Sequence, residues 1–213
     1  MQQKLEKAKK IYLLPFNPKK KKIVMKKNLL KGALASIIVL STVAFTSIKK
    51  QIDVKSSTVV WTGKKVTGEH VGTLQFKDGH FMVEDGKLVG GEFTIDMTSL
   101  KNTDLEGESK QKLEGHLKSE DFFGIEKYPT SKLVITSVAA KGNGMYGVVG
   151  NLTIKNETHP ITFDLKYAED AASTTLSIDR SKYDVRYGSG SFFDNLGDKT
   201  IYDNFDLDVN LKF

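Results

Sequence analysis

Apolar and polar residues alternate with a period of two along much of the chain after residue 57. The alternation is clearest at residues 93–97, 146–154, 161–167 and 205–213. Such alternation places one side of a strand in an apolar interior and the other side in water. Turn-forming residues predict hairpin connections at 77–79, 84–86, 141–144 and 156–160. Turns about ten residues apart are typical of an all-β antiparallel meander closed into a barrel or sandwich.

One segment departs from this pattern. Residues 105–117 carry three leucines among Glu, Lys and Gln and contain no β-branched residue, which predicts a short, weakly amphipathic helix. Ser119 stands where it could cap a further helical turn ahead of Phe122 and Phe123. The helix falls between two predicted strands, so we expect it to be an excursion that covers one end of the barrel.

The amino-terminal segment predicts export. Residues 32–45 are uncharged and largely apolar, lysines precede them, and small residues follow. This order is typical of a secretory signal peptide, with cleavage expected between about Ala44 and Ile48. The apolar stretch is short for a membrane span, which needs about 20 residues, although an uncleaved anchor or a buried helix is the alternative. No stable membrane span is expected after cleavage.

Met25 begins a complete signal on its own. We therefore expect three parts: residues 1–24 as a non-native or extended leader, 25–48 as the signal peptide, and 49–213 as the folded domain. Residues 1–48 contain 11 lysines and one acid, so the +6 of the whole chain leaves −4 on residues 49–213. A mildly acidic domain argues against nucleic-acid binding, which needs a concentrated positive face.

Three stretches of sequence resemble a known family. Residues 116–123 (HLKSEDFF) with 128–130 (YPT), residues 150–163 (GNLTIKNETHPITF), and the late pair 179–180 (DR) with 183–185 (YDV) are similar to motifs of the YceI-like family, in the same order. In the second motif Asn156 stands where the family has a turn glycine, and Asn tolerates a positive φ. The resemblance implies a lipocalin-like barrel with an elongated apolar interior. It also implies binding of polyisoprenoid or related amphiphilic lipids and a periplasmic location.

The candidate ligand-binding residues are of two kinds. Inward positions of the alternating strands predict an apolar lining, although an ordinary packed core explains the same pattern. These positions are Phe93, Ile95, Met97, Leu133, Ile135, Tyr146, Val148, Leu152, Ile161, Phe163, Leu165, Leu176 and Ile178. Candidates for the mouth or an end of the barrel are Trp61, His116, Phe122, Phe123, Arg180 and Arg186. Trp61 either closes one end or belongs to the core, and only one of Phe122 and Phe123 can point inward from a strand.

Arg180 and Arg186 are the only arginines of the chain. Their planar guanidinium groups suit either a lipid diphosphate or a carboxylate, for which Asp179, Asp184 and Asp121 are the candidates. A structural pairing with a carboxylate is the favoured interpretation, because a buried arginine needs one.

Catalytic chemistry has little support in the sequence. The absence of cysteine excludes disulfides, thiolate catalysis and Cys-ligated zinc. The four histidines lack metal-ligand spacing, so no metal is expected, and no cofactor-binding motif is present. No residue is predicted to be catalytic. The expected function is binding of an isoprenoid or other long-chain lipid. An enzyme acting on a small lipid or stress metabolite, a solid-core scaffold barrel, and a homodimer are open alternatives.

Overall fold

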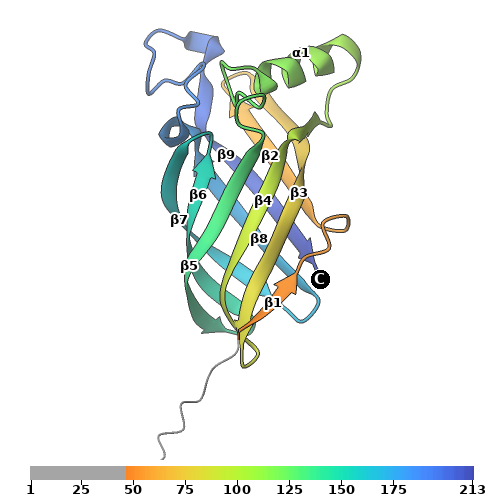
Figure 1. Cartoon of the computed structure of the whole chain (residues 1–213). Helices are drawn as coiled ribbons and strands as arrows, with labels where there is room; N and C mark the ends of the chain where they lie inside the picture. Colours follow the sequence, from red (N-terminus) through yellow and green to blue (C-terminus); the bar gives the residue numbers. More distant parts are fainter. Residues whose placement is uncertain (1–46) are drawn as a thin grey trace, which may run out of the picture. The chain divides into compact units, whose positions relative to one another are not determined.

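A computed structural model describes residues 47–213 as an antiparallel β-barrel with one α-helix (Figure 1). The predicted signal peptide and leader lie outside the described residues, apart from the last two positions of residues 25–48. The regular elements are β1 (Ile48–Gln51), β2 (Thr58–Lys65), β3 (Gly68–Glu84), β4 (Lys87–Asn102), α1 (Gly107–Lys118), β5 (Thr130–Gly142), β6 (Met145–Ile154), β7 (Glu157–Tyr167), β8 (Ala171–Asp179) and β9 (Ile201–Lys212), with short 3₁₀ turns η1 (Arg180–Tyr183) and η2 (Gly197–Lys199).

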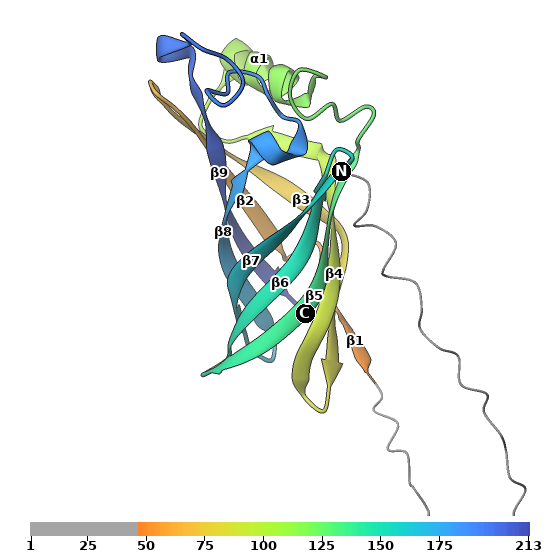
Figure 2. The same cartoon turned by 90° about the vertical axis from the view of Figure 1, so that its left-hand side faces the viewer.

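Eight strands, β2 to β9, form the closed wall. Each pairs with the next along the chain, and β9 pairs back with β2, so the predicted meander and barrel are confirmed. The ninth strand, β1, pairs with the far part of β3 beyond the end of β2. The seam between β7 and β8 is the exception to regular pairing, because only two residue pairs join these strands next to their hairpin. In Figure 2 the two strands diverge above that hairpin.

Two of the four predicted turns are correct. The chain reverses at Asp85-Gly86 and at Asn143-Gly144, where all four residues have the positive φ of tight hairpins. Residues 77–79 are instead part of β3, where a bulge interrupts the pairing with β4. Gly79 is needed there for space, since a Cβ would lie 2.6 Å from the Phe93 ring and 2.9 Å from Ile52.

The hairpin between β6 and β7 is tighter than expected. It turns at residues 155–156, and the rest of the predicted turn, including His159 and Pro160, belongs to β7. The residue with a positive φ is Lys155, at 56°, so the prediction that Asn156 fills this role is wrong. The Lys155 ammonium donates to the backbone oxygen of Asp184 at 2.8 Å, which links this hairpin turn to the end of η1.

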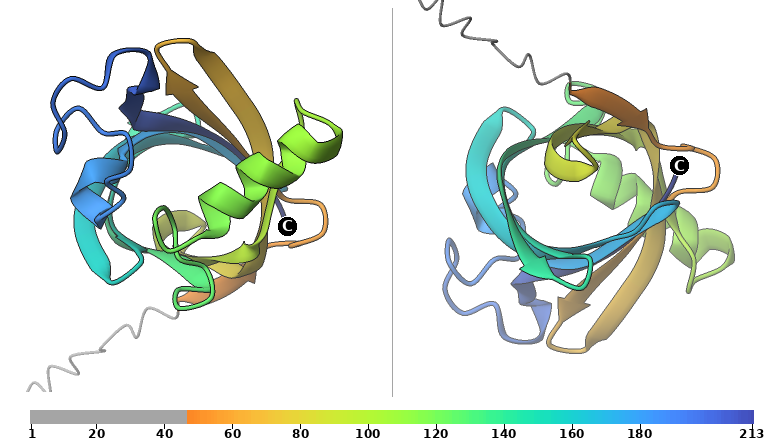
Figure 3. Two further views of the ribbon diagram at one scale, coloured as in Figure 1. Left: turned by 90° about the horizontal axis from the view of Figure 1, so that it is seen from above. Right: turned by 90° about the horizontal axis from the view of Figure 1, so that it is seen from below.

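The predicted helix is α1, and it lies across one end of the barrel (Figure 3). Ser119 ends this helix and does not cap a new one: its hydroxyl donates to the backbone oxygen of His116 at 2.8 Å. The opposite end is filled by a cluster of aromatic rings around Phe81, which is 1% exposed. Phe81 contacts the rings of Phe93, Tyr167 and Phe213 with centroid distances of 4.9, 5.2 and 5.8 Å.

Candidate functional site

The barrel encloses an apolar cavity of about 120 Å³. Its walls come from all eight barrel strands and from Phe123, and apart from Ser131, Lys132 and Thr174 every lining residue is apolar. The predicted inward residues that line it are Phe93, Ile95, Met97, Leu133, Ile135, Leu152, Ile161, Phe163, Leu165 and Leu176. The interior of this barrel is therefore not completely packed.

Three residues of the predicted lining are not among the cavity walls. Val148 is completely buried in the main core cluster, and Tyr146 packs against that cluster. Ile178 belongs to a second cluster with Ile154 and Tyr183. These three side chains point inward, as the alternation predicts, but they pack against neighbouring side chains and leave no free space beside them. Alternation does not distinguish an inward residue that is packed in this way from one that lines a cavity.

Residues on β2, β3 and β9, together with Ile154 on β6, also line the cavity and do not belong to the predicted lining. The alternation on β9 was visible in the sequence and identifies its members, whereas β2 and β3 contain glycine and bulges that obscure the period. These additional residues are Val59, Leu74, Phe76, Phe81, Ile154, Phe205, Leu207, Val209 and Leu211.

A second hollow, the upper chamber, has a volume of about 370 Å³ and lies beneath α1. The chamber is lined by Trp61, Gly63, Lys64, Lys65, His70, Leu74, Leu100, Leu113, His116, Leu117, Phe122, Phe123, Arg180, Tyr187, Asp198, Lys199, Ile201, Tyr202 and Phe205. Leu74, Phe123 and Phe205 also line the barrel cavity, so the two hollows share these three side chains as a common wall. The upper chamber combines apolar walls with several charged and aromatic polar groups.

Both phenylalanines after α1 face the interior. Phe122 is 5% exposed and lines the upper chamber, and Phe123 lines both hollows. The expectation that only one of them points inward is wrong, because they lie in a turn and not in a strand. Their rings contact edge to face at 5.1 Å.

Trp61 and His116 lie in the wall of the upper chamber. Trp61 is on β2, the first strand of the wall, and is 8% exposed. His116 is in the last turn of α1, with its ring 4.3 Å from Tyr187 and 5.6 Å from Phe122 between centroids. Trp61 therefore does not close the barrel at the aromatic end, which the Phe81 cluster fills.

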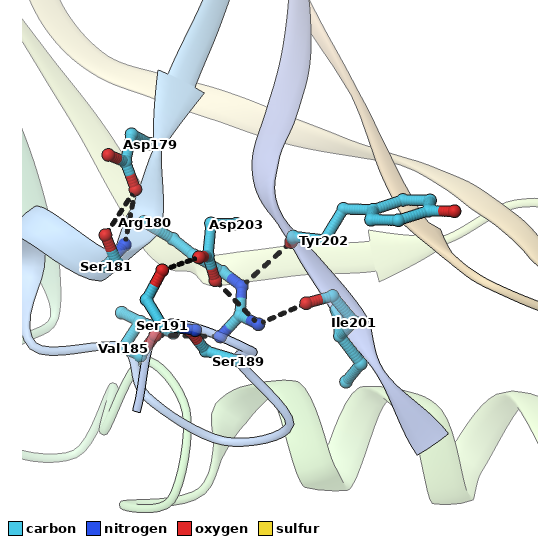
Figure 4. A network of polar contacts seen from close by, with 9 residues as sticks. All are labelled: Asp179, Arg180, Ser181, Val185, Ser189, Ser191, Ile201, Tyr202 and Asp203. Carbon is cyan, nitrogen blue, oxygen red and sulfur yellow. Dashed lines mark hydrogen bonds and ion pairs between the residues drawn. The ribbon is translucent and has the colours of Figure 1, made fainter. Parts of the chain in front are cut away.

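Arg180 is 2% exposed and is held by backbone oxygens (Figure 4). Its guanidinium donates to Val185 at 2.7 Å, Ile201 at 2.9 Å and Tyr202 at 3.1 Å. The nearest carboxylate is that of Asp203, 3.6 Å away, and not one of the three predicted partners. This arrangement ties the end of β8 to the start of β9.

Asp203 completes this network. Burial alone would raise the pKa of its carboxyl, but hydrogen bonds from Ser189 and Ser191 and the charge of Arg180 outweigh burial and lower the pKa. Burial lowers the pKa of Arg180, and the charges of Asp203 and Asp179 oppose that shift. The pair is therefore charged at neutral pH.

Arg186 lies outside both hollows. Its side chain is 60% exposed and pairs with Asp184 at 2.6 Å, one of the predicted carboxylates. The histidines are dispersed: His70 bonds Asp104 at 2.8 Å and His159 packs against Tyr183. Within residues 47–213 there is no group of three or more His, Cys, Asp or Glu side chains placed to hold a metal ion.

A family model described as a YceI-like domain matches residues 51–213, nearly the whole described barrel. The chain belongs to this family. Among its relatives, a UPF0312 protein of Shewanella denitrificans is 31% identical over 144 residues, which cover 65% of this chain and 71% of that protein. A UPF0312 protein of Pseudomonas putida is 34% identical over 92 residues, 43% of this chain and less than half (46%) of that relative.

Solved structures share the fold. The crystal structure of Burkholderia cenocepacia BcnA superposes with a TM-score of 0.62 at 22% identity and covers 75% of this chain and 98% of BcnA. A polyisoprenoid binding domain from Saccharophagus degradans, implicated in plant cell wall breakdown, superposes with a TM-score of 0.53 at 14% identity, covering 79% of this chain and 97% of that domain. At these identities the likeness establishes the lipocalin-like barrel of the YceI-like family. Within residues 47–213, no helix has the length and hydrophobicity to cross a membrane.

Proposed function

We propose that this protein binds and carries a long-chain isoprenoid or similar amphiphilic lipid and is not an enzyme. The observation that carries the proposal is the apolar barrel cavity, which adjoins a wider chamber across the shared wall of Leu74, Phe123 and Phe205. The apolar chain would lie along the barrel axis, with its head group in the upper chamber beneath α1. Burial of each CH₂ from water contributes about 0.8 kcal/mol, so a long chain supplies most of the affinity.

Membership of the YceI-like family supports this function, as does the polyisoprenoid binding domain that shares the fold. The upper chamber, at about 370 Å³, falls in the range of known ligand pockets of roughly 300–1,000 Å³. The barrel cavity below is smaller, at about 120 Å³, and its almost entirely apolar lining suits a hydrocarbon chain.

The test compares two tryptophan substitutions on adjacent residues of β8. Leu176 lines the cavity and Thr175 is exposed on the outer face. Leu176→Trp should fill the cavity and reduce binding of tritiated geranylgeraniol in equilibrium dialysis at least tenfold, whereas Thr175→Trp should bind like the unmodified protein. Equal binding by both variants, or no binding by the unmodified protein, would contradict the proposal.

We also propose that the protein is exported to the periplasm after removal of its signal peptide. The basic and apolar segments before residue 48 support this location. Intact-mass measurement of the exported protein should give an amino terminus between Ala44 and Gln51. A mature protein that retains Leu29 would contradict cleavage.

A further inference from the structure

We propose that the lipid enters and leaves the barrel sideways, through the wall between β7 and β8, and not lengthwise past α1. The route is the side window, defined as residues 158–165 of β7 and residues 174–179 of β8, which no strand pairing joins. This inference rests on the proposed lipid-binding function and specifies the path by which the ligand reaches the same cavity.

The side window has fixed limits at both ends. At its lower end, the hairpin between β7 and β8 is held by its two residue pairs. At its upper end, η1 follows β8 and contacts β7, where the rings of Tyr183 and His159 meet edge to face with 5.2 Å between their centroids. Opening is therefore confined to one bounded stretch of the wall.

The strand edges at the window have features of unpaired edges. Pro160 lies within the unpaired part of β7, and proline is largely confined to edge strands because it has no N–H to donate to a ladder. Across the window, the hydroxyl of Thr174 donates to the backbone oxygen of Asp164 at 2.7 Å. A side chain thus supplies the connection that backbone amides supply between the other wall strands. Parting this contact costs less than breaking a ladder of several hydrogen bonds.

The inner side of the window adjoins the barrel cavity. Ile161 and Phe163 of β7 and Leu176 of β8 line the cavity and are half-buried, whereas Leu165, next to the hairpin, is 2% exposed. The middle of the outer border carries no charge and consists of Pro160, Thr162, Thr175 and Ser177. An apolar chain that crosses there does not have to displace water from a charged side chain, which would oppose its passage.

Both ends of the barrel are obstructed, which disfavours a lengthwise route. The aromatic cluster around Phe81 fills one end, and α1 lies across the other (Figure 3). Ile161 and Leu176, on the two sides of the window, pack against the same core cluster as Phe123 and Phe205 of the wall shared by the two hollows. A ligand that enters sideways therefore arrives beside this shared wall, with the cavity on one side for its chain and the chamber on the other for its head group.

A reversible cross-link across the window tests this route. When the register of the hairpin is continued, Thr162 lies opposite Ser177, and both are exposed. The chain contains no cysteine, so in the double variant Thr162→Cys, Ser177→Cys only the new thiols react with a bifunctional methanethiosulfonate, and a reductant removes the bridge. The matched control is Ser137→Cys, Val149→Cys, which places the same bridge between two exposed, directly paired residues of β5 and β6.

Each variant is loaded with tritiated geranylgeraniol, cross-linked, and mixed with excess phosphatidylcholine vesicles, and the transfer of label to the vesicles is followed over time. The window bridge should slow transfer at least tenfold, reductant should restore the original rate, and the control bridge should leave the rate unchanged. Equilibrium dialysis should give the same affinity with and without the window bridge, because a blocked route slows binding and release equally.

The outcomes are distinguishable. If the window bridge leaves the transfer rate unchanged, the lipid passes by another route and the inference is wrong, while lipid binding stands. If the control bridge slows transfer as much as the window bridge, motion of the whole wall limits release and the inference is also wrong. If the unmodified protein binds no geranylgeraniol, the proposed function itself fails.

Discussion

The two arginines of the chain occupy opposite environments. Arg180 is buried with three backbone hydrogen bonds and the Asp203 carboxylate, whereas Arg186 is solvent-exposed with one ion pair. Lysine has a single ammonium group and cannot reproduce the planar fork that reaches three oxygens. We expect Arg180→Lys to lower the free energy of unfolding by about 2–4 kcal/mol.

Urea denaturation measures this loss, and Arg186→Lys is the control, with an expected change within about 0.5 kcal/mol. Similar values for the two variants would show that the Arg180 network contributes no more than a surface pair. The rarity of arginine in the sequence pointed to a special role at position 180, but the partner Asp203 could not be predicted. It lies 23 residues away and meets Arg180 only because β8 and β9 are neighbours.

Tyr183 makes the protein sensitive to alkaline conditions. Burial, together with the negative charge of Asp179, raises the pKa of its phenol to about 12. Because the folded pKa is higher than the unfolded value of about 10, the resulting stability is complete below pH 10 and is lost as pH rises through 12. Absorbance at 295 nm should therefore detect one tyrosine that ionises last, and Tyr183→Phe should remove that late step.

Two adjacent valines of β6 lie in opposite environments, one buried in the core and one on the outer face. Val148 is 0% exposed in the core, and Val149, on the outer face, is 36% exposed. Tryptophan at position 148 would have no free space, since this residue is not part of the cavity wall. We expect Val148→Trp to cost roughly 1–3 kcal/mol of stability through overpacking. Val149→Trp should be nearly neutral, and urea denaturation of both variants checks the difference.

The strands themselves could be predicted from alternation, but interruptions within them could not. The run Lys77-Asp78-Gly79 predicts a turn by its composition, yet the glycine makes room for the packing of Phe93 and Ile52. A strand allows only one of the consecutive Phe122 and Phe123 to face inward, whereas the turn in which they lie allows both. Local composition does not distinguish a glycine that bends the chain from one that makes room for a neighbour.

At the scale of the whole molecule, the closed barrel and its helix followed from sequence pattern, and the family resemblance added the hollow interior. Alternation identified most of the inward side chains that line the cavity. It could not say where inward side chains leave space, because that depends on distances across the barrel. The sequence predicts Trp61, His116 and Arg180 at the mouth or an end of the barrel, but not the chamber that they share, because residues 61, 116, 180 and 202 converge there only after the wall closes.

The barrel wall is most weakly joined at the seam between β7 and β8, where the fewest residue pairs connect neighbouring strands. Each other pair of neighbouring wall strands is joined by six or more residue pairs, so widening there would break a ladder of hydrogen bonds. With only two residue pairs, β7 and β8 have fewer backbone hydrogen bonds to break than any other neighbouring wall strands. We therefore expect this seam to open more readily than the rest of the wall. In β7, amides facing β6 should exchange slowly with deuterium and those facing β8 rapidly, with the contrast most marked between residues 158 and 165.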